Sequence, residues 1–173
     1  MSAQHNLFRL NIGFIIHQTV GFSRDFKIEA LLVKLPPDLD LLDLDGKVRV
    51  TRTPQGLLFQ VKMAASIVAE CVRCLEIFSQ PLLVDFTELY AFSMDSATES
   101  ELLVPEEGII DLAPLIRDEF FLSVPLSPLC NRDCKGFCAY CGGNLNSDTC
   151  EHDEIQVDPR LDILKSLLED DLT

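Results

Sequence analysis

The fold is decided by residues 47–74, which read KVRVTRTPQGLLFQVKMAASIVAECVRC. Val48 and Val50 alternate with charged residues, and after a turn at Pro54-Gln55-Gly56 apolar residues recur at every second position from Leu57 to Ala69. A period of two is typical of a strand with one buried face, so the stretch predicts a β-hairpin with a long second strand. That second strand leads directly into Cys71-Val72-Arg73-Cys74.

Further strands are predicted on both sides of this hairpin. Phe8–Ile16 and Phe26–Val33 are rich in Ile, Val, Phe and Leu and are expected to be extended, and Pro81–Tyr90 is expected to return alongside the long strand. Asp38–Asp45 alternates leucines with aspartates and predicts either an edge strand or a loop. Residues 1–92 therefore form the β-rich N-terminal part of a single domain.

The C-terminal half has a different pattern. Residues 93–108 are acidic and irregular and predict a mobile loop. Asp111 is placed to cap a helix that Pro125 ends, and Asp158-Pro159 opens an amphipathic C-terminal helix. Residues 109–173 thus hold a helix, a Cys-rich zinc segment and the C-terminal helix. The predicted fold is α+β, an antiparallel β-rich core with one or two packing helices and a zinc-binding Cys-rich C-terminal segment.

The charge of the chain restricts its partners. The 173 residues include 28 Asp and Glu against 14 Lys and Arg, a formal net charge of -14. Such a chain repels phosphate, which argues against a broad nucleic-acid-binding face. It favours basic partners, of which ribosomal proteins are one class, unless the charge serves only solubility. No apolar run reaches the roughly 20 residues of a spanning helix and residues 1–5 lack a basic signal region, so we expect a cytoplasmic protein without a membrane partner.

Seven cysteines carry the chemistry of this sequence. In a reducing compartment, closely spaced cysteines indicate metal ligands or redox sites before disulfides. His152 makes eight ligands, enough for two tetrahedral zinc ions. Glycines beside the cysteines permit the positive φ that bends backbone around a bound sulfur. The ligands fall into four pairs: Cys71 with Cys74, Cys130 with Cys134, Cys138 with Cys141, and Cys150 with His152.

Spacing leaves two ways to combine the pairs. In the preferred arrangement, the pair from Cys138 joins the pair from Cys150, and the pair from Cys71 joins the pair from Cys130, since short ligand spacings tend to share a site. A zinc ion in the second of these sites would connect the β-rich half to the C-terminal segment. In the rival arrangement, the four cysteines between Cys130 and Cys141 share one ion. Spacing alone does not separate the two.

Other interpretations of the cysteines are weaker. Buried cysteines acting as small apolar residues would explain one or two of them but not four pairs. Redox chemistry at Cys71 and Cys74 would need a helix N-terminus after the strand, and iron–sulfur runs are absent. Closed four-ligand zinc sites are structural, and the sequence has no Gly-rich phosphate loop, no G-x-S-x-G and no H-E-x-x-H. We therefore expect no enzyme activity and no small-molecule substrate.

Several motifs together carry a resemblance to a known family. They are Glu70-Cys71-Val72-Arg73-Cys74-Leu75, Phe86-x-Glu88, Asp111-Leu112 with Asp118-Glu119, residues 125–138 (PLSPLCNRDCKGFC), residues 141–146 (CGGNLN) and Asp158-Pro159-Arg160-Leu161. From about Glu70 to Leu168 the sequence resembles the YceD family, the large ribosomal RNA subunit accumulation proteins. Two positions depart from the family's pattern, Ala139 where proline is common and His152 where a cysteine is frequent. Imidazole can replace thiolate on zinc.

The resemblance implies a non-enzymatic factor for accumulation of large-subunit (23S) ribosomal RNA, acting in ribosome assembly and stabilised by zinc. The implied partners are basic ribosomal proteins or large-subunit rRNA in assembly intermediates. Arg73, Arg132 and Lys135 are candidates for a local RNA contact, and they would gather if both nearby cysteine pairs share a zinc. The alternative hypothesis is a zinc- or redox-responsive protein-interaction module unrelated to ribosomes.

Overall fold

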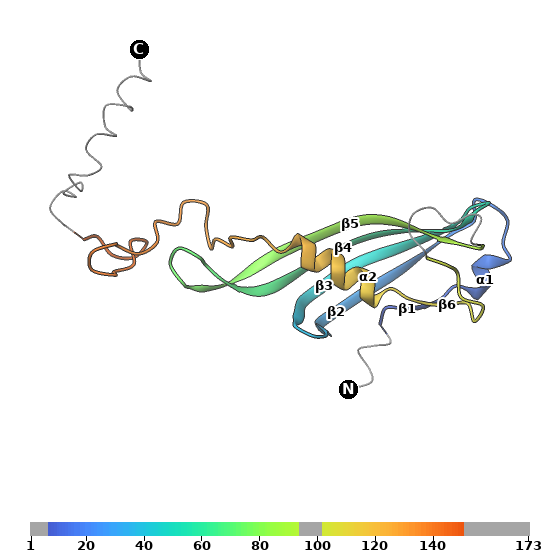
Figure 1. Cartoon of the computed structure of the whole chain (residues 1–173), viewed down its shortest axis with the longest axis horizontal. Coiled ribbons are helices and arrows are strands. Elements are labelled where there is room, and N and C mark those ends of the chain that lie inside the picture. Colours follow the sequence, from blue (N-terminus) through green and yellow to red (C-terminus); the bar gives the residue numbers. More distant parts are fainter. Residues whose placement is uncertain (1–6, 94–101, 151–173) are drawn as a thin grey trace, which may run out of the picture.

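The computed structural model describes residues 7–93 and 102–150, and its main element is a four-stranded antiparallel sheet in the order β2-β3-β4-β5 (Figure 1). Its strands are β2 (Ser23–Leu35), β3 (Leu39–Arg52), β4 (Gly56–Glu70) and β5 (Ile77–Ala91). A two-stranded sheet pairs β1 (Arg9–Asn11) with β6 (Ile109–Asp111), and the helices are α1 (Gly13–Ile16) and α2 (Ala113–Ser123). The described part of the chain is thus mostly antiparallel β with two helices, which agrees with the predicted α+β class.

The predicted hairpin at residues 47–70 is confirmed. β3 and β4 are joined by a turn in which the Gly56 N–H donates to Thr53 Oγ1 at 3.1 Å. β5 returns along the full length of β4, from the pair Gly56↔Ala91 to the pair Glu70↔Ile77. The β4–β5 hairpin therefore extends beyond the rest of the sheet and carries Cys71 and Cys74 at its tip (Figure 1).

The expectation of an extended Phe8–Ile16 is wrong in its second half. The strand ends at Asn11, whose Oδ1 accepts a hydrogen bond from the Gly13 N–H at 3.2 Å. A side chain that binds the backbone two residues on competes with the sheet ladder and turns the chain. Helix α1 follows, so Ile12 and Ile15 are both buried at a spacing of three.

Leu39–Asp45 is the start of β3, and Asp38 lies in the turn before it, so the prediction of a loop is wrong. β3 lies between β2 and β4, but β4 pairs with it only from Leu42 onward, so Leu39–Leu41 alone has the character of an edge strand. The leucines at positions 39, 41 and 44 are buried and the aspartates point outward. A bulge between Leu42 and Asp45, with Asp43 at φ 50°, inserts one extra residue and shifts the alternation, which hides the strand pattern in the sequence.

The core lies between the sheet and α2, which crosses one face of it (Figure 1). Ile116 and Phe120 of α2 are fully buried, as are Phe59 and Val61 of β4. The helix cap differs slightly from the prediction, because the N-cap residue is Leu112, while the Oδ1 of Asp111 accepts a hydrogen bond from the Ala113 N–H at 2.9 Å. A carboxylate still satisfies one of the helix's first N–H groups.

Parts of the predicted C-terminal organisation lie outside the described residues. These parts are positions 94–101 of the acidic loop and residues 151–173, including His152 and the helix expected from Asp158. The described end of the loop returns to the sheet through a bridge between Ala91 and Leu103. Over the described ranges, no helix is long and apolar enough to cross a membrane.

Candidate metal centre

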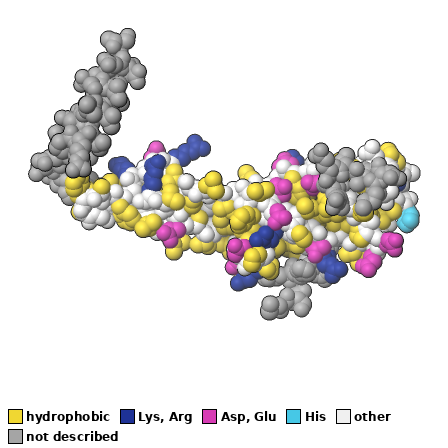
Figure 2. Space-filling view, viewed as in Figure 1, with side chains coloured by type: hydrophobic (Ala, Val, Ile, Leu, Met, Phe, Trp, Pro, Cys, Tyr) yellow, Lys and Arg dark blue, Asp and Glu magenta, His cyan; other side chains and the backbone are white. Residues whose placement is uncertain are grey.

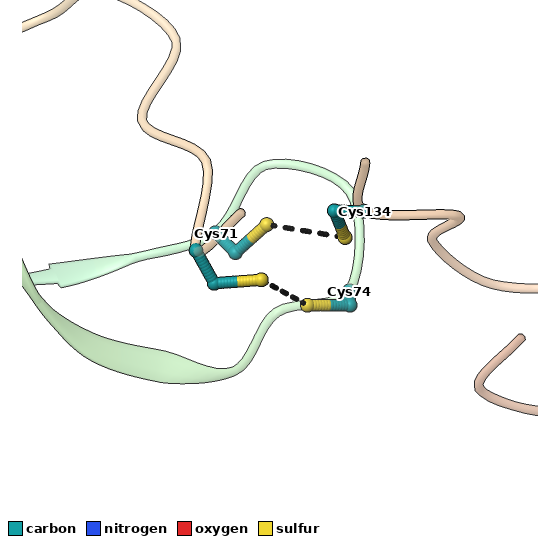
Figure 3. A group of neighbouring side chains, drawn as sticks. Cys71, Cys74 and Cys134 are labelled. Atoms are coloured by element: carbon teal, nitrogen blue, oxygen red, sulfur yellow. Dashed lines mark hydrogen bonds between the residues drawn. The ribbon is translucent and has the colours of Figure 1, made fainter. Parts of the chain in front are cut away.

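Four cysteines converge at the tip of the β4–β5 hairpin. Cys71 and Cys74 come from the turn between β4 and β5, and Cys130 and Cys134 come from the segment after α2. Figure 3 labels Cys71, Cys74 and Cys134 of this group. All four sulfur atoms lie within 4.8 Å of one another. The sulfurs of Cys71 and Cys134 are 3.8 Å apart, and those of Cys74 and Cys130 are 3.5 Å apart. A tetrahedral zinc ion with Zn–S distances of about 2.3 Å places its ligands about 3.8 Å apart, so the cluster has the size that zinc requires.

The hairpin turn is shaped to present two sulfurs on one side. The backbone carbonyl of Glu76 closes the turn by accepting a hydrogen bond from the Cys71 N–H at 2.9 Å. The Leu75 N–H donates to the Cys71 carbonyl at 2.9 Å. Leu75 adopts φ 56°, a left-handed conformation that is costly for leucine. Val72 in turn donates its N–H to the Pro128 carbonyl at 3.0 Å, which ties the segment before Cys130 to the turn.

The backbone around Cys134 fits closely against Arg73. The Arg73 Nη1 donates to the Cys134 carbonyl at 2.8 Å. Gly136 has φ 74°, and a Cβ on it would lie 3.0 Å from the Arg73 carbonyl oxygen. Glycine is therefore required at 136 both for its conformation and for this close approach. Three of the four ligands, Cys71, Cys74 and Cys134, are at most 2% exposed.

A second group contains Cys138, Cys141 and Cys150, whose sulfurs also lie within 4.8 Å of one another. A tight turn joins the first two, with the Gly142 N–H donating to the Cys138 carbonyl at 2.9 Å and Gly142 at φ 70°. The Tyr140 N–H points at the Cys138 sulfur at 3.4 Å. This group is less buried than the first, because Cys141 is exposed.

Asparagine side chains connect the two groups. The Asn146 Nδ2 lies 3.4 Å from the Cys134 sulfur, and the Asn146 Oδ1 accepts the Lys135 N–H at 2.9 Å. Asn144 reaches the hairpin, with its Nδ2 donating to Glu76 Oε1 at 2.9 Å. Cysteine spacing alone did not point to these two asparagines. The CGGNLN motif was a signal for them, since metal sites commonly have polar partners around the ligands.

Hydrogen bonds divide the thiols of the first group into acidic and basic members. Burial would raise the pKa of Cys71, but the backbone N–H groups of Cys130, Arg73 and Cys74 oppose it and lower that pKa to about 6. The hydrogen bond to Cys74, together with burial, raises the pKa of Cys130 to about 12. One thiolate is thus stabilised by backbone donors and a neighbouring thiol keeps its proton, as expected for sulfurs that share charge at close range.

The second group has the same division. The backbone N–H groups of Cys141 and Tyr140 lower the pKa of Cys138 to about 6. The hydrogen bond to Cys138, together with burial, raises the pKa of Cys150 to about 11. A metal cation binds the deprotonated form of each ligand and releases the remaining protons.

The donor sets fit zinc or another thiophilic cation. The first group offers four sulfurs and needs no further ligand, and the second offers three sulfurs and lacks one ligand for a tetrahedron. This grouping is the first of the two arrangements that spacing allowed. The predicted fourth ligand of the second group, His152, lies outside the described residues, so its place there stays a prediction.

The sequence comparisons agree with these motifs. Residues 59–168 match the family model described as large ribosomal RNA subunit accumulation protein YceD. An uncharacterised protein of Mycobacterium bovis is 37% identical over 152 residues, covering 85% of this chain and 70% of its own length. The YlbN protein of Bacillus subtilis is 27% identical over 161 residues, covering 92% and 90%.

A shorter part of the chain is similar in sequence to a plant protein. A chloroplastic YCED homologue of Zea mays, named as a large ribosomal RNA subunit accumulation protein, is 44% identical over 50 residues, covering 27% of this chain and 17% of its own length. No solved structure matches. The family match spans most of the chain and includes both cysteine groups, and the chain therefore belongs to the YceD family.

Proposed function

We propose that this protein is a non-enzymatic factor for the accumulation of large-subunit (23S) ribosomal RNA, acting during ribosome assembly, with two zinc ions holding its Cys-rich segment on the β4–β5 hairpin. Membership of the YceD family carries the ribosomal part of this proposal, supported by the names of the plant relatives. The four-sulfur group at the hairpin tip supports the zinc part.

The geometry of the first group favours a structural ion over a catalytic one. A catalytic zinc keeps a position for water or substrate, whereas four protein sulfurs fill a tetrahedron. Three of these sulfur-bearing residues are almost inaccessible to solvent. An ion in this place stabilises the connection between two parts of the chain, Cys71–Cys74 and Cys130–Cys134, that are more than 50 residues apart in the sequence.

The distribution of charge suggests where partners bind. Most cations of the sheet and α2 pair with carboxylates, for example Arg49 with Asp25 and Lys62 with Asp85, both at 2.7 Å. Arg73, Arg132 and Lys135 are in the Cys-rich part instead, and Figure 2 shows Lys and Arg side chains gathered at the narrow end of the molecule. We assign a local RNA contact to this end and the contacts with basic proteins to the acidic body.

The proposal is tested by complementation. In its own source organism, deletion of this chain should lower the ratio of 23S to 16S rRNA. Return of the unaltered chain should restore this ratio, and a Cys71→Ser, Cys74→Ser double variant should not. The purified proteins should contain two zinc ions and at most one, respectively. If the double variant restores the ratio as well as the unaltered chain does, zinc is not needed for the function. If deletion leaves the ratio unchanged, the ribosomal role is wrong.

One observation favours the alternative, a zinc- or redox-responsive interaction module. Cys141 is exposed, so an oxidant can reach the second group. In that case mild peroxide would release one zinc and change the set of bound proteins, while rRNA levels would not depend on the protein. An unchanged set of bound proteins after peroxide treatment would exclude this alternative.

A further inference from the structure

The four-stranded sheet divides into a fork near the Cys-rich end. Pairing between β3 and β4 stops at Leu42↔Ser66. Beyond that pair, the backbone of β3 continues to Leu39 paired with β2 alone, and the backbone of β4 continues to Glu70 paired with β5 alone. Figure 1 shows the β2–β3 turn and the longer β4–β5 hairpin separating at this point. The two hairpins therefore leave a gap between facing strands.

The β4 side of the fork is an open strand edge. Residues Ile67–Glu70 pair with Ile77–Gln80 of β5, so their backbone is already extended. On the side that faces β3, no strand or bridge formed by the described residues pairs with it. Proteins usually protect such edges with charges, prolines or a covering element, because unpaired N–H and C=O groups attract another strand. Residues 67–69 are instead Ile, Val and Ala.

A cavity of about 310 Å³ occupies the fork. Its apolar wall includes Leu32 of β2, Leu42 of β3 and Val68 of β4, and Leu32 and Val68 are 42% and 65% exposed. The charged residues that line it are Asp38 and Asp40, and no Lys or Arg does so. Asp38 pairs with Arg117 at 3.3 Å and Asp40 with Lys34 at 3.6 Å, and both carboxylates remain more than half exposed. The fork is thus an apolar slot with an acidic rim.

We propose that this fork binds an extended segment of a basic protein, which adds to β4 as a strand along residues 67–70. Alternate side chains of such a strand point to opposite sides of the sheet. Apolar residues would therefore lie on the side of Leu39 and Ile67, which also line the cavity, while lysines or arginines between them lie on the side of Asp40. Backbone hydrogen bonds supply affinity, and the acidic rim supplies selectivity for basic sequences.

Charge distinguishes a basic protein from two rival occupants of the fork, the C-terminal residues of the same chain and a second copy of it. Residues 151–173 of the same chain carry eight acidic and two basic residues, so an acidic rim disfavours them. A second copy of this chain would likewise bring net negative charge to the fork. A basic partner is the occupant whose charge is complementary. The inference rests on the proposed function only for the expectation that this partner is a protein of the assembling large subunit.

The direct test uses the full chain and a labelled ten-residue peptide of alternating valine and lysine. Fluorescence anisotropy at physiological salt measures its affinity, and hydrogen exchange measures the amides of Ile67–Glu70. A peptide of the same composition with its valines and lysines in two blocks is the control for charge alone. The alternating peptide should bind at least about tenfold more tightly than the block peptide and should slow exchange at these amides.

Two matched pairs of variants locate the site. Val68→Lys should weaken binding at least about tenfold, because a lysine blocks the edge. Leu83→Lys changes a similarly exposed aliphatic residue of β5 outside the fork and should have less than about a twofold effect. Asp40→Asn removes a charge from the rim and should weaken binding about three- to fivefold, whereas Asp45→Asn, on β3 away from the cavity, should not. Circular dichroism checks that all four variants fold.

Several outcomes would overturn the inference. These are binding of both peptides with equal affinity, unchanged exchange at Ile67–Glu70, or equal effects of Val68→Lys and Leu83→Lys. A dimer that Val68→Lys dissociates would identify a second copy as the occupant, and peptide binding that appears only after removal of residues 151–173 would identify that segment. If Val68→Lys abolishes peptide binding but restores rRNA fully, the fork has no role in the function while the proposed function stands.

Discussion

The two cysteine groups are built from similar sequence motifs but occupy very different surroundings. In the first, Cys71 and Cys134 are 0% and 2% exposed, and the ligands come from two segments that are distant in sequence. In the second, Cys138 is buried but Cys141 is exposed, and the ligands come from residues 138–150. An ion in the first group joins the Cys-rich segment to the sheet, and an ion in the second shapes only the segment itself.

This difference predicts a hierarchy of effects. A cross-link between distant segments removes more conformational freedom from the unfolded chain than a local one does, although the difference grows only slowly with the length of the closed loop. Loss of the ion also leaves close, buried sulfur atoms without the cation that holds them together, and thiols with a raised pKa such as Cys130 take up a proton again. Substitutions around the first group should therefore have the larger consequences.

The largest effect is expected from Cys74→Ser. With three sulfurs left, the first site should lose its zinc, and zinc in small structural sites contributes of order 10 kcal/mol to folding. We expect one zinc ion per chain by elemental analysis and release of the Cys-rich segment, measured as rapid protease cleavage between Pro125 and Cys130. Cleavage as slow as in the unaltered chain would show that the segment docks without this ion.

Cys141→Ser is the matching substitution in the second group and tests the loss of the second ion alone. Zinc should again fall to one ion per chain, but the segment should stay docked, and the midpoint of thermal unfolding of the sheet should shift by less than about 2 °C, since the change lies on the surface. Differential scanning calorimetry provides the midpoint. A shift as large as that of Cys74→Ser would contradict the difference between the sites.

The two positive-φ glycines of the Cys-rich segment, Gly136 and Gly142, sharpen the comparison further. Gly136→Ala should weaken zinc binding at the first site by about 2 kcal/mol or more, because the left-handed φ is costly and the new Cβ would press on the Arg73 carbonyl. Gly142→Ala has the same φ but no atom within 4 Å of the new Cβ, so it should cost only about 1 kcal/mol at the second site. Competition with a chelator measures both values, and equal costs would argue against the close packing at Gly136.

The smallest effect concerns the contact between the groups. Asn144→Ala removes the hydrogen bond to Glu76 and should weaken docking of residues 138–150 on the hairpin by about 1 kcal/mol. Hydrogen exchange at the Leu145 amide, which donates to the Gly136 carbonyl at 2.9 Å, reports this docking. Glu76→Gln keeps an acceptor and should change exchange little. A faster exchange in both variants would assign the effect to the charge of Glu76 instead.

The sequence predicted the elements that follow a regular period. The long β4 strand and its return in β5 were recognisable because their apolar residues alternate without interruption. The start of β3 was not, because the bulge near Asp43 shifts the alternation by one residue. The end of the first strand was missed because a single side chain, Asn11, turns the chain.

Prediction of the candidate site from the sequence is limited in the same way, because local patterns are visible and distant contacts are not. Ligand types and pairs follow from local spacing, but the choice between two ways of combining them depends on where distant segments meet. That meeting point is set by the length of the β4–β5 hairpin and by the path of the chain after α2, which carries Cys130 back to the tip. Asn144 and Asn146 connect the groups through contacts that no spacing rule contains.

The most direct test of the account is the metal content and ligand set of the reduced, full-length protein. Elemental analysis should find two zinc ions per chain, and X-ray absorption should find seven sulfur ligands and one nitrogen ligand shared between them, with Zn–S distances of about 2.3 Å. Protein without zinc that still keeps Cys130–Cys134 docked at the hairpin tip would contradict the central claim that metal joins these segments.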